Sequence, residues 1–151
     1  MNIQNEEKVV RYVERFQSVI ASDGFAGFFH ADAGDNTQAT LNALLIIEAI
    51  DAAALLRRAM WMFEGGAPPR EQIARREALR QIGETERSVL RQLDERFSRS
   101  NDELTRSLAR YSQSLEERYY VAWKEDKWAF LAPNTNAHGQ HTRRRGYISD
   151  F

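Results

Sequence analysis

The sequence predicts an all-α protein, a compact bundle of about six to seven helices with a flexible C-terminal tail. Apolar residues recur at three- and four-residue steps along most of the chain, which is the period of a helix buried on one face. Clusters of Gly, Pro, Asp and Asn interrupt this pattern at intervals, as turns between helices do. Apolar residues make up 42% and charged residues 28% of the 151 residues, a balance that predicts a folded core.

Two helices are predicted in the first 30 residues. An apolar stripe that includes Val13 and Phe16 places the first helix at residues 5–21, and the residues 22–24, Ser-Asp-Gly, end it. Phe25, Phe28 and Phe29 repeat the helical spacing over a short second helix. We expect these three rings in the core, because aromatic side chains bury the most apolar surface.

Two further helices are predicted before the Gly- and Pro-rich loop at residues 64–69. Residues 31–36 are rich in Asp, Gly and Asn and predict a turn. A third helix at residues 37–50 has few polar residues and is expected to be the most buried helix of the chain. Asp51 is expected to cap the fourth helix, which the two prolines of the loop end.

The second half of the chain continues the helical pattern. Residues 69–97 predict helix with a break near Gly83, since an unbroken helix of that length would be as wide as the domain. Ser100 and Glu103 have the spacing of a capping box and predict the start of another helix. Residues 119–131 fit either a continued helix with a kink or a small hairpin.

The predicted organisation is one helical domain at residues 1–132 and a mobile polar and basic tail at residues 133–151. The chain contains no cysteine, which excludes disulfides and thiolate chemistry and fits a reducing compartment. Neither a signal peptide nor an apolar run long enough to cross a bilayer is seen. We therefore expect a cytoplasmic protein that does not associate with membranes.

The charge balance bears on the class of partner. The net charge is −1, whereas direct capture of nucleic acid needs a marked basic excess, so direct nucleic-acid binding is not expected. The three arginines at positions 143–145 fit a solubilising tail better than a phosphate-binding site. No Gly-rich phosphate loop, ordered Ser/His/Asp set or helix-borne His pair is present, and no cofactor is predicted.

One cluster offers a catalytic alternative. His30, Asp32 and Asp35 combine a histidine with two carboxylates, which are metal ligands or acid–base groups in many enzymes. A calcium-binding loop that starts at Asp32 fails, because Gly34 and Ala43 occupy positions that require ligands. The competing interpretation of the cluster is a turn whose Asp side chains bond the local backbone.

Two sets of side chains are candidates for partner binding. The acidic set could form one face over the first two helices and the following turn, although Arg11 and Arg15 would partly neutralise it. Its members are Glu6, Glu7, Glu14, Asp23, Asp32 and Asp35. Trp123 and Trp128 are either interface anchors or a cover for the domain's own core. Self-association through Trp61, Trp123 or Trp128 is a second hypothesis.

Several local features occur together in a fixed order. They are Gly24-Phe25 with Phe28-Phe29, the Gly34-Asp35 turn, the Ala-rich stretch of residues 44–54 followed by Leu55-Leu56, and Leu93-Asp94. Together they resemble the DMP-like family, a bacterial domain family of unknown function typified by a DNA-mimic protein, over residues 5–115. The resemblance implies a compact all-helical domain and, for the typical member, binding to a DNA-binding regulator through acidic side chains.

The sequence thus predicts a non-catalytic protein that binds a macromolecule. The partner is expected to be a protein, such as a DNA-binding regulator or a toxin, engaged through the acidic and aromatic surface. The alternative is a metal-dependent enzyme that uses His30, Asp32 and Asp35.

Overall fold

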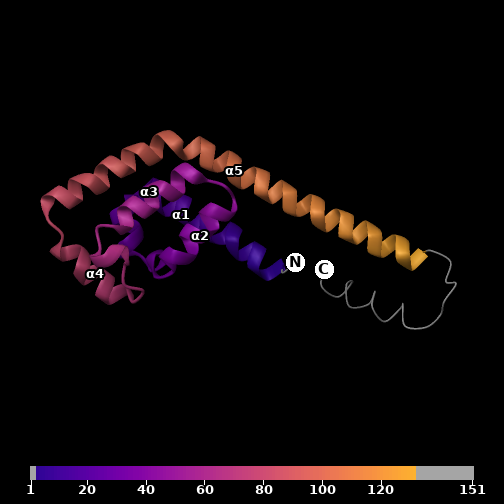
Figure 1. The fold of residues 1–151 in the computed structure, drawn as a ribbon, viewed down its shortest axis with the longest axis horizontal. Coiled ribbons are helices and arrows are strands. Elements are labelled where there is room, and N and C mark those ends of the chain that lie inside the picture. The colour runs from indigo at the N-terminus through magenta and orange to yellow at the C-terminus, as the bar shows by residue number, and fades with distance from the viewer. Residues whose placement is uncertain (1–2, 132–151) are drawn as a thin grey trace. The chain divides into compact units, whose positions relative to one another are not determined.

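The computed structural model describes residues 3–131, and that range contains five α-helices, two short 3-10 helices and no strand (Figure 1). The elements are α1 (Ile3–His30), η1 (Asp32–Asn36), α2 (Thr37–Ile46), α3 (Ile50–Met60), η2 (Glu64–Gly66), α4 (Gln72–Gln81) and α5 (Glu84–Leu131). The all-α prediction is confirmed, whereas a total of six to seven helices is wrong because α5 alone takes the place of several. The predicted tail at 133–151 lies outside the described residues.

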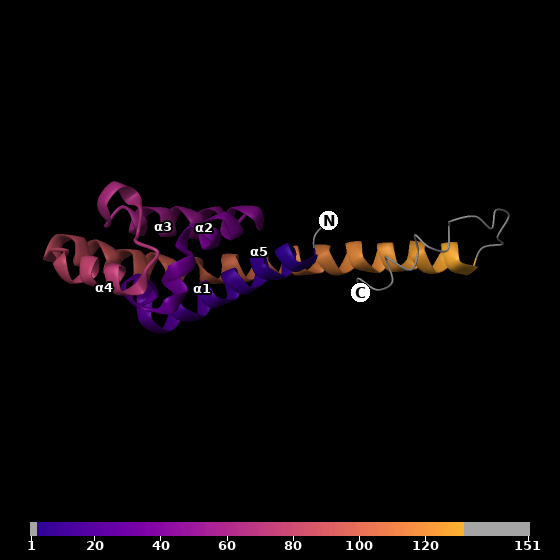
Figure 2. The ribbon, with the colours of Figure 1, turned by 90° about the horizontal axis from the view of Figure 1, so that it is seen from below.

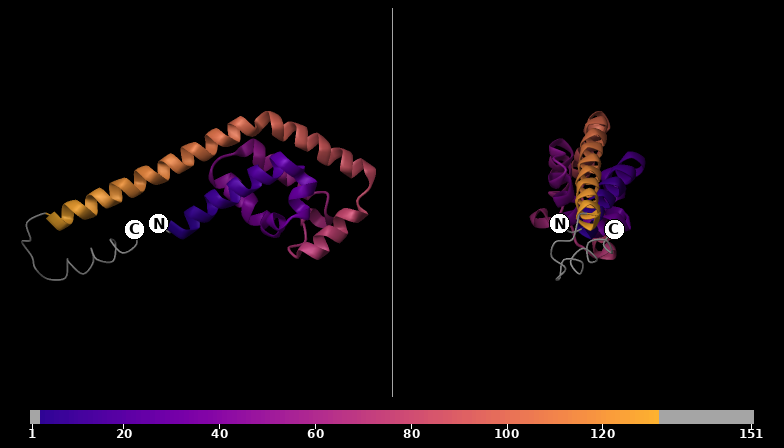
Figure 3. Two further views of the ribbon diagram at one scale, coloured as in Figure 1. Left: turned by 180° about the vertical axis from the view of Figure 1, so that it is seen from behind. Right: turned by 90° about the vertical axis from the view of Figure 1, so that its right-hand side faces the viewer.

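The chain divides after Tyr111 into two units, Met1–Tyr111 and Ser112–Phe151. All residues of the hydrophobic core belong to the first unit. There, α2 and α3 lie together on one side of α1 (Figure 2), and α4 leads through a short connection into the start of α5 (Figure 3). The single domain at residues 1–132 stays a prediction.

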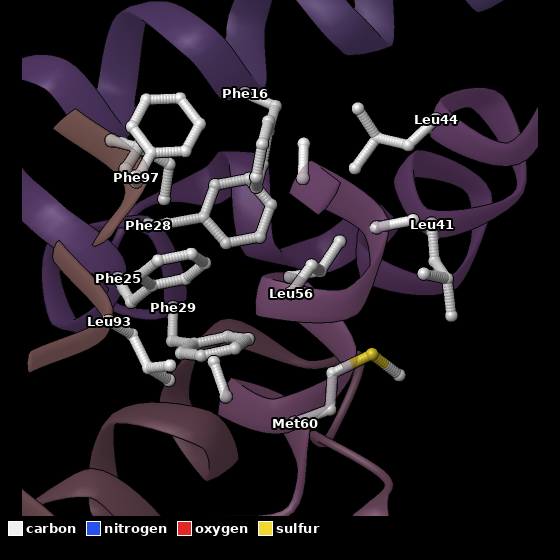
Figure 4. Packing of buried hydrophobic residues seen from close by; sticks show 14 of the residues in the cluster. Phe16, Phe25, Phe28, Phe29, Leu41, Leu44, Leu56, Met60, Leu93 and Phe97 are labelled. Carbon is white, nitrogen blue, oxygen red and sulfur yellow. The ribbon is translucent and has the colours of Figure 1, made fainter. Parts of the chain in front are cut away.

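The core is built around phenylalanine. Phe16, Phe25 and Phe97 contact one another edge to face, with ring centroids 5.6–6.3 Å apart, and Phe28 and Phe29 continue the cluster (Figure 4). The three phenylalanines at 25, 28 and 29 are at most 1% exposed, which confirms their predicted burial. Edge-to-face pairs contribute about 0.5–1.5 kcal/mol beyond the area that they bury.

Gly24 interrupts α1 where the sequence predicts a stop. Its φ of 73° and ψ of −176° are not helical, and helix resumes at once on the far side. The first two predicted helices are therefore two segments of α1 joined by a kink. Phe25 begins the second segment, which turns the aromatic face of that segment into the core.

The predicted helix at residues 37–50 ends earlier than expected. α2 stops at Ile46, and Glu48 takes a positive φ of 63° before α3 begins at Ile50. Asp51 therefore lies in the first turn of α3 rather than at its cap, which corrects the capping prediction. A glutamate is an unusual residue for this conformation, so the end of α2 at this point could not be predicted from the sequence.

The break near Gly83 is confirmed, since α4 ends at Gln81 and α5 begins at Glu84. The helix start predicted at Ser100 is wrong, because α5 passes through it without interruption. The Ser100 hydroxyl donates instead to the carbonyls of Arg96 and Phe97, 3.1 and 3.3 Å away. Residues 119–131 are helix, which settles the alternative left open by the sequence.

Within the described part of the chain, no helix is long and apolar enough to span a membrane.

Candidate functional site

The turn after α1 is organised by one buried arginine on α4. Arg75 is 0% exposed, and all five of its N–H groups donate. The acceptors are the carbonyl oxygens of Phe29, Ala31, Pro69 and Arg70 and the carboxylate of Asp35. Gly34 lies so close that a Cβ there would be 2.6 Å from Arg75 Nε, so only glycine fits. Arg75 therefore ties together the end of α1, η1 and the start of α4.

This arrangement decides how the His30, Asp32 and Asp35 cluster is used. Asp35 Oδ1 accepts from Arg75 Nη2 at 2.8 Å, and Asp32 is ion-paired with Arg15. His30 is exposed, and its backbone carbonyl accepts from side chains of α4. Among residues 3–131, no three His, Asp or Glu side chains are grouped so that they could hold a metal ion. The structure therefore does not favour the metal-dependent alternative, because each carboxylate of the cluster is already ion-paired with an arginine.

The acidic residues of α1 do not share one face. Glu7 and Glu14 are seven residues apart and lie on one side of the helix, whereas Asp23 is nine residues beyond Glu14 and lies on the other. Arg11 sits between Glu7 and Glu14 on their side, as its spacing of four and three residues requires. The surface that the six predicted acids form is therefore mixed in charge rather than uniformly negative.

A seventh carboxylate, Asp94 on α5, has a structural role that the sequence did not suggest. Its Oδ1 accepts from the backbone N–H of Phe25 at 2.8 Å, which caps the second segment of α1 after the kink. A Cβ on Gly24 would lie 2.5 Å from Asp94 Oδ2. Burial raises the pKa of Asp94, and the Phe25 hydrogen bond only partly opposes this shift.

Asp23 and Asp94 line the same groove. This groove has a volume of about 420 Å³ and is also bordered by Ser22, Ser98 and Asn101. The sequence pattern that could have pointed to Asp94 is its position within the apolar stripe of α5, one residue after the buried Leu93. A carboxylate at such a position requires a partner, and here the partner is the end of another helix.

The most exposed aromatic side chains of the second unit lie on α5. Tyr120 is 59% and Trp123 46% exposed, and their ring centroids are 6.1 Å apart. Val121 adds a further exposed apolar side chain, and Glu116, Glu117 and Lys124 lie on the same helix. Trp128 belongs to α5, but its side chain lies outside the described residues. The predicted aromatic surface is thus represented by Tyr120 and Trp123, and sequence reasoning had not singled out Tyr120.

Exposed apolar side chains also occur in the first unit. Leu45, Ile46 and Ile50 are 46–60% exposed at the corner between α2 and α3. The expectation that the helix at 37–50 is buried therefore holds for only one of its faces. Trp61 is 60% exposed, and its ring lies against Gly66.

The chain has a recognisable family. Residues 1–119 match the family described as DMP19-like protein. No curated protein and no solved structure gives a match. The match covers the whole of the first unit and the start of the second.

Proposed function

Because the chain belongs to the DMP19-like protein family, we propose that it is a non-catalytic protein that binds a protein partner through α5. The observation that supports this function is the exposed aromatic pair Tyr120 and Trp123. Large aromatic side chains dominate binding hot spots, because they bury much apolar area at a small cost in conformational entropy. We call Tyr120 and Trp123 the aromatic patch of α5.

The charges beside this patch favour a protein partner. Glu116 precedes Tyr120 by one helical turn, and Lys124 follows it by one turn, so charges of both signs flank the aromatic pair. An aromatic centre with a charged rim is the usual composition of a protein–protein interface. Glu116 and Glu117 would meet basic side chains of the partner.

The class of partner is the finer part of the proposal. We place it among DNA-binding regulators or toxins in the bacterial cytoplasm, a compartment that suits a chain without cysteine. Glu6, Glu7 and Glu14 of α1 are a second candidate surface for basic side chains of such a partner, whereas Asp23 lies on the opposite side of that helix. Asp32 and Asp35 are less suited to this role, since Arg15 and Arg75 already neutralise them.

Affinity purification from the native host, followed by quantitative mass spectrometry, tests the proposal. The tagged wild type should recover a stoichiometric protein partner, and the variant Tyr120→Ser/Trp123→Ser should lose most of it. Trp61→Ser is the matched control, because it removes an exposed aromatic ring from the first unit. Equal recovery by the double variant, or recovery of no partner by the wild type, would contradict the proposal.

A second experiment separates self-association from binding of a different protein. Light scattering of the purified chain over a range of concentrations measures the mass of the particle. A monomer mass at every concentration is expected. A dimer that the double variant abolishes would mean that the aromatic patch binds a second copy instead.

A further inference from the structure

An open groove of about 480 Å³ lies between the end of α1 and α4, and the first turn of α5 completes it. Ala26 and His30, one helical turn apart, border it from α1. Ile73, Arg76 and Arg80 border it from α4. Every residue around this groove belongs to the first unit, in which α1 and α4 are in contact.

The burial of Arg75 on one face of α4 determines which side chains lie on the exposed face. Arg75 and Leu79 point into the protein, at 0% and 7% exposure. Ile73, Arg76 and Arg80 therefore follow one another along the outer face at steps of three and four residues. Ile73 is 74% exposed, so an apolar side chain stands exposed one helical turn before Arg76.

The groove is basic although the whole chain carries a net charge of −1. Three arginines, at positions 76, 80 and 87, border it against one acid, Glu77. Arg76 is held in place by the bond from its Nε to the His30 carbonyl at 2.9 Å. Its Nη1 and Nη2 have no partner among the described residues.

Of the other two arginines, Arg87 is held in the same way and Arg80 only weakly. Arg80 Nη1 lies 3.4 Å from Glu77 Oε2, a long ion pair between exposed side chains. Arg87 Nη2 donates to the Leu79 carbonyl at 2.9 Å and so closes the end of α4. Guanidinium groups that are already oriented lose less conformational entropy when they bind an anion.

We propose that this groove docks an acidic segment of a partner protein. An apolar side chain of the segment packs on Ile73 and Ala26, and its carboxylates bond to Arg76, Arg80 and Arg87. Planar guanidinium groups bind carboxylates with two parallel hydrogen bonds, which gives such a site directionality. This surface is separate from the aromatic patch of α5 and does not depend on the function proposed for that patch.

An acidic protein segment fits the groove better than nucleic acid does. The exposed Ile73 offers nothing to a phosphate backbone, but it suits an apolar side chain flanked by acids. Proteins that bind nucleic acid usually do so through an extended basic surface. This chain has 21 basic against 22 acidic residues.

Selection from a random dodecapeptide library displayed on phage, against the immobilised full chain, tests the proposal. Enriched peptides should carry two or more Asp or Glu residues around an apolar residue. Their affinity, measured by fluorescence anisotropy, should fall at least about tenfold in Arg76→Ala/Arg80→Ala, as expected when charged hydrogen bonds are lost. The control Arg57→Ala/Arg58→Ala removes the same charge from exposed positions on α3 and should bind as the wild type does.

A second variant tests whether weaker binding by Arg76→Ala/Arg80→Ala reflects only the loss of positive charge. Ile73→Ser keeps every arginine and should also weaken the selected peptides, because it removes the apolar contact. Circular dichroism of each variant verifies the fold. The proposal is overturned if no acidic peptides are enriched, if their affinity is equal for wild type and Arg76→Ala/Arg80→Ala, or if a single-stranded DNA dodecamer binds the groove more tightly than they do.

Discussion

Arg75 shows how far one side chain can determine the structure around it. A buried guanidinium is costly unless all its donors are used, and here each donor meets an acceptor in the last turn of α1, in the turn that follows it or in the loop before α4. The sequence presents Arg75 as one of several arginines in a charged helix. Its burial was not predictable, because two of its four carbonyl acceptors, those of Phe29 and Ala31, lie more than 40 residues earlier in the chain.

Replacement of Arg75 should therefore destabilise the protein strongly. Arg75→Ala leaves four carbonyl oxygens and Asp35 without their donor, and we expect a loss of about 3–5 kcal/mol in the free energy of unfolding. Urea denaturation followed by circular dichroism measures it. Asp35→Asn is the control and should cost about 1 kcal/mol or less, since its side chain is 43% exposed. Equal effects of the two variants would show that the carbonyl contacts contribute little.

Asp94 gives a prediction for the dependence of stability on pH. Its pKa is raised by burial, so the folded state binds the proton more tightly than the unfolded state does. The Asp94 contribution to stability is thus greatest below the ordinary value of 3.8 and is lost as pH rises through the raised value. Asp94→Asn keeps an oxygen for the Phe25 N–H but does not titrate.

The melting temperatures of wild type and Asp94→Asn should be compared from about pH 3 to pH 7. Subtraction of the two curves removes the effect of the other carboxylates. The wild type should lose stability relative to the variant as pH rises from about 4. A constant difference over this range would contradict the raised pKa.

At the scale of single elements, patterns within one helix were predictable and the junctions were less so. The phenylalanine spacing at 25, 28 and 29 predicted burial correctly, because it depends only on helical period. The corner at Glu48 was missed because neither a glycine nor a proline marks it, although local backbone hydrogen bonds from Glu48 to Leu45 and from Ala49 to Leu44 close the end of α2 there. The helix start predicted from the capping-box spacing at Ser100 is wrong, because the same residues also fit the interior of a helix that continues before and after them.

The kink in α1 requires glycine. Gly24 combines a φ of 73° with a ψ of −176°, a region that is almost confined to glycine, and its α-carbon faces Asp94. Gly24→Ala should destabilise the protein by about 3 kcal/mol through backbone strain and the close contact. Chemical denaturation measures the change. Ala26→Gly in the following turn is a control for flexibility, and it should cost about 1 kcal/mol. A neutral Gly24→Ala would mean that the kink is not fixed.

Ser100 distinguishes a helix interior from a helix start. In the interior of α5 its hydroxyl bonds to carbonyls of the preceding turn, so Ser100→Ala should be neutral or stabilise by up to about 0.5 kcal/mol. A true N-cap would lose about 1 kcal/mol on the same change. Thermal unfolding of the variant decides between the two.

For the whole molecule, the helical periodicity of the sequence predicted the all-α fold class, but it did not locate the surfaces. The acids chosen from the sequence are divided by helix geometry, as Glu14 and Asp23 show, and Asp35 proved to be structural. The aromatic patch was partly predictable through Trp123. Tyr120 was not, because no local pattern in the sequence distinguishes an exposed from a buried tyrosine at this position of α5.

The central claim is that the aromatic patch of α5 contacts a different protein. Photocrosslinking in the native host, with p-benzoylphenylalanine in place of Tyr120, tests this contact directly. Irradiation should give one discrete adduct with a partner protein, whereas the same probe at Ala109, an exposed position of α5 in the first unit, should give none. No adduct at position 120, or identical adducts at both positions, would contradict the account.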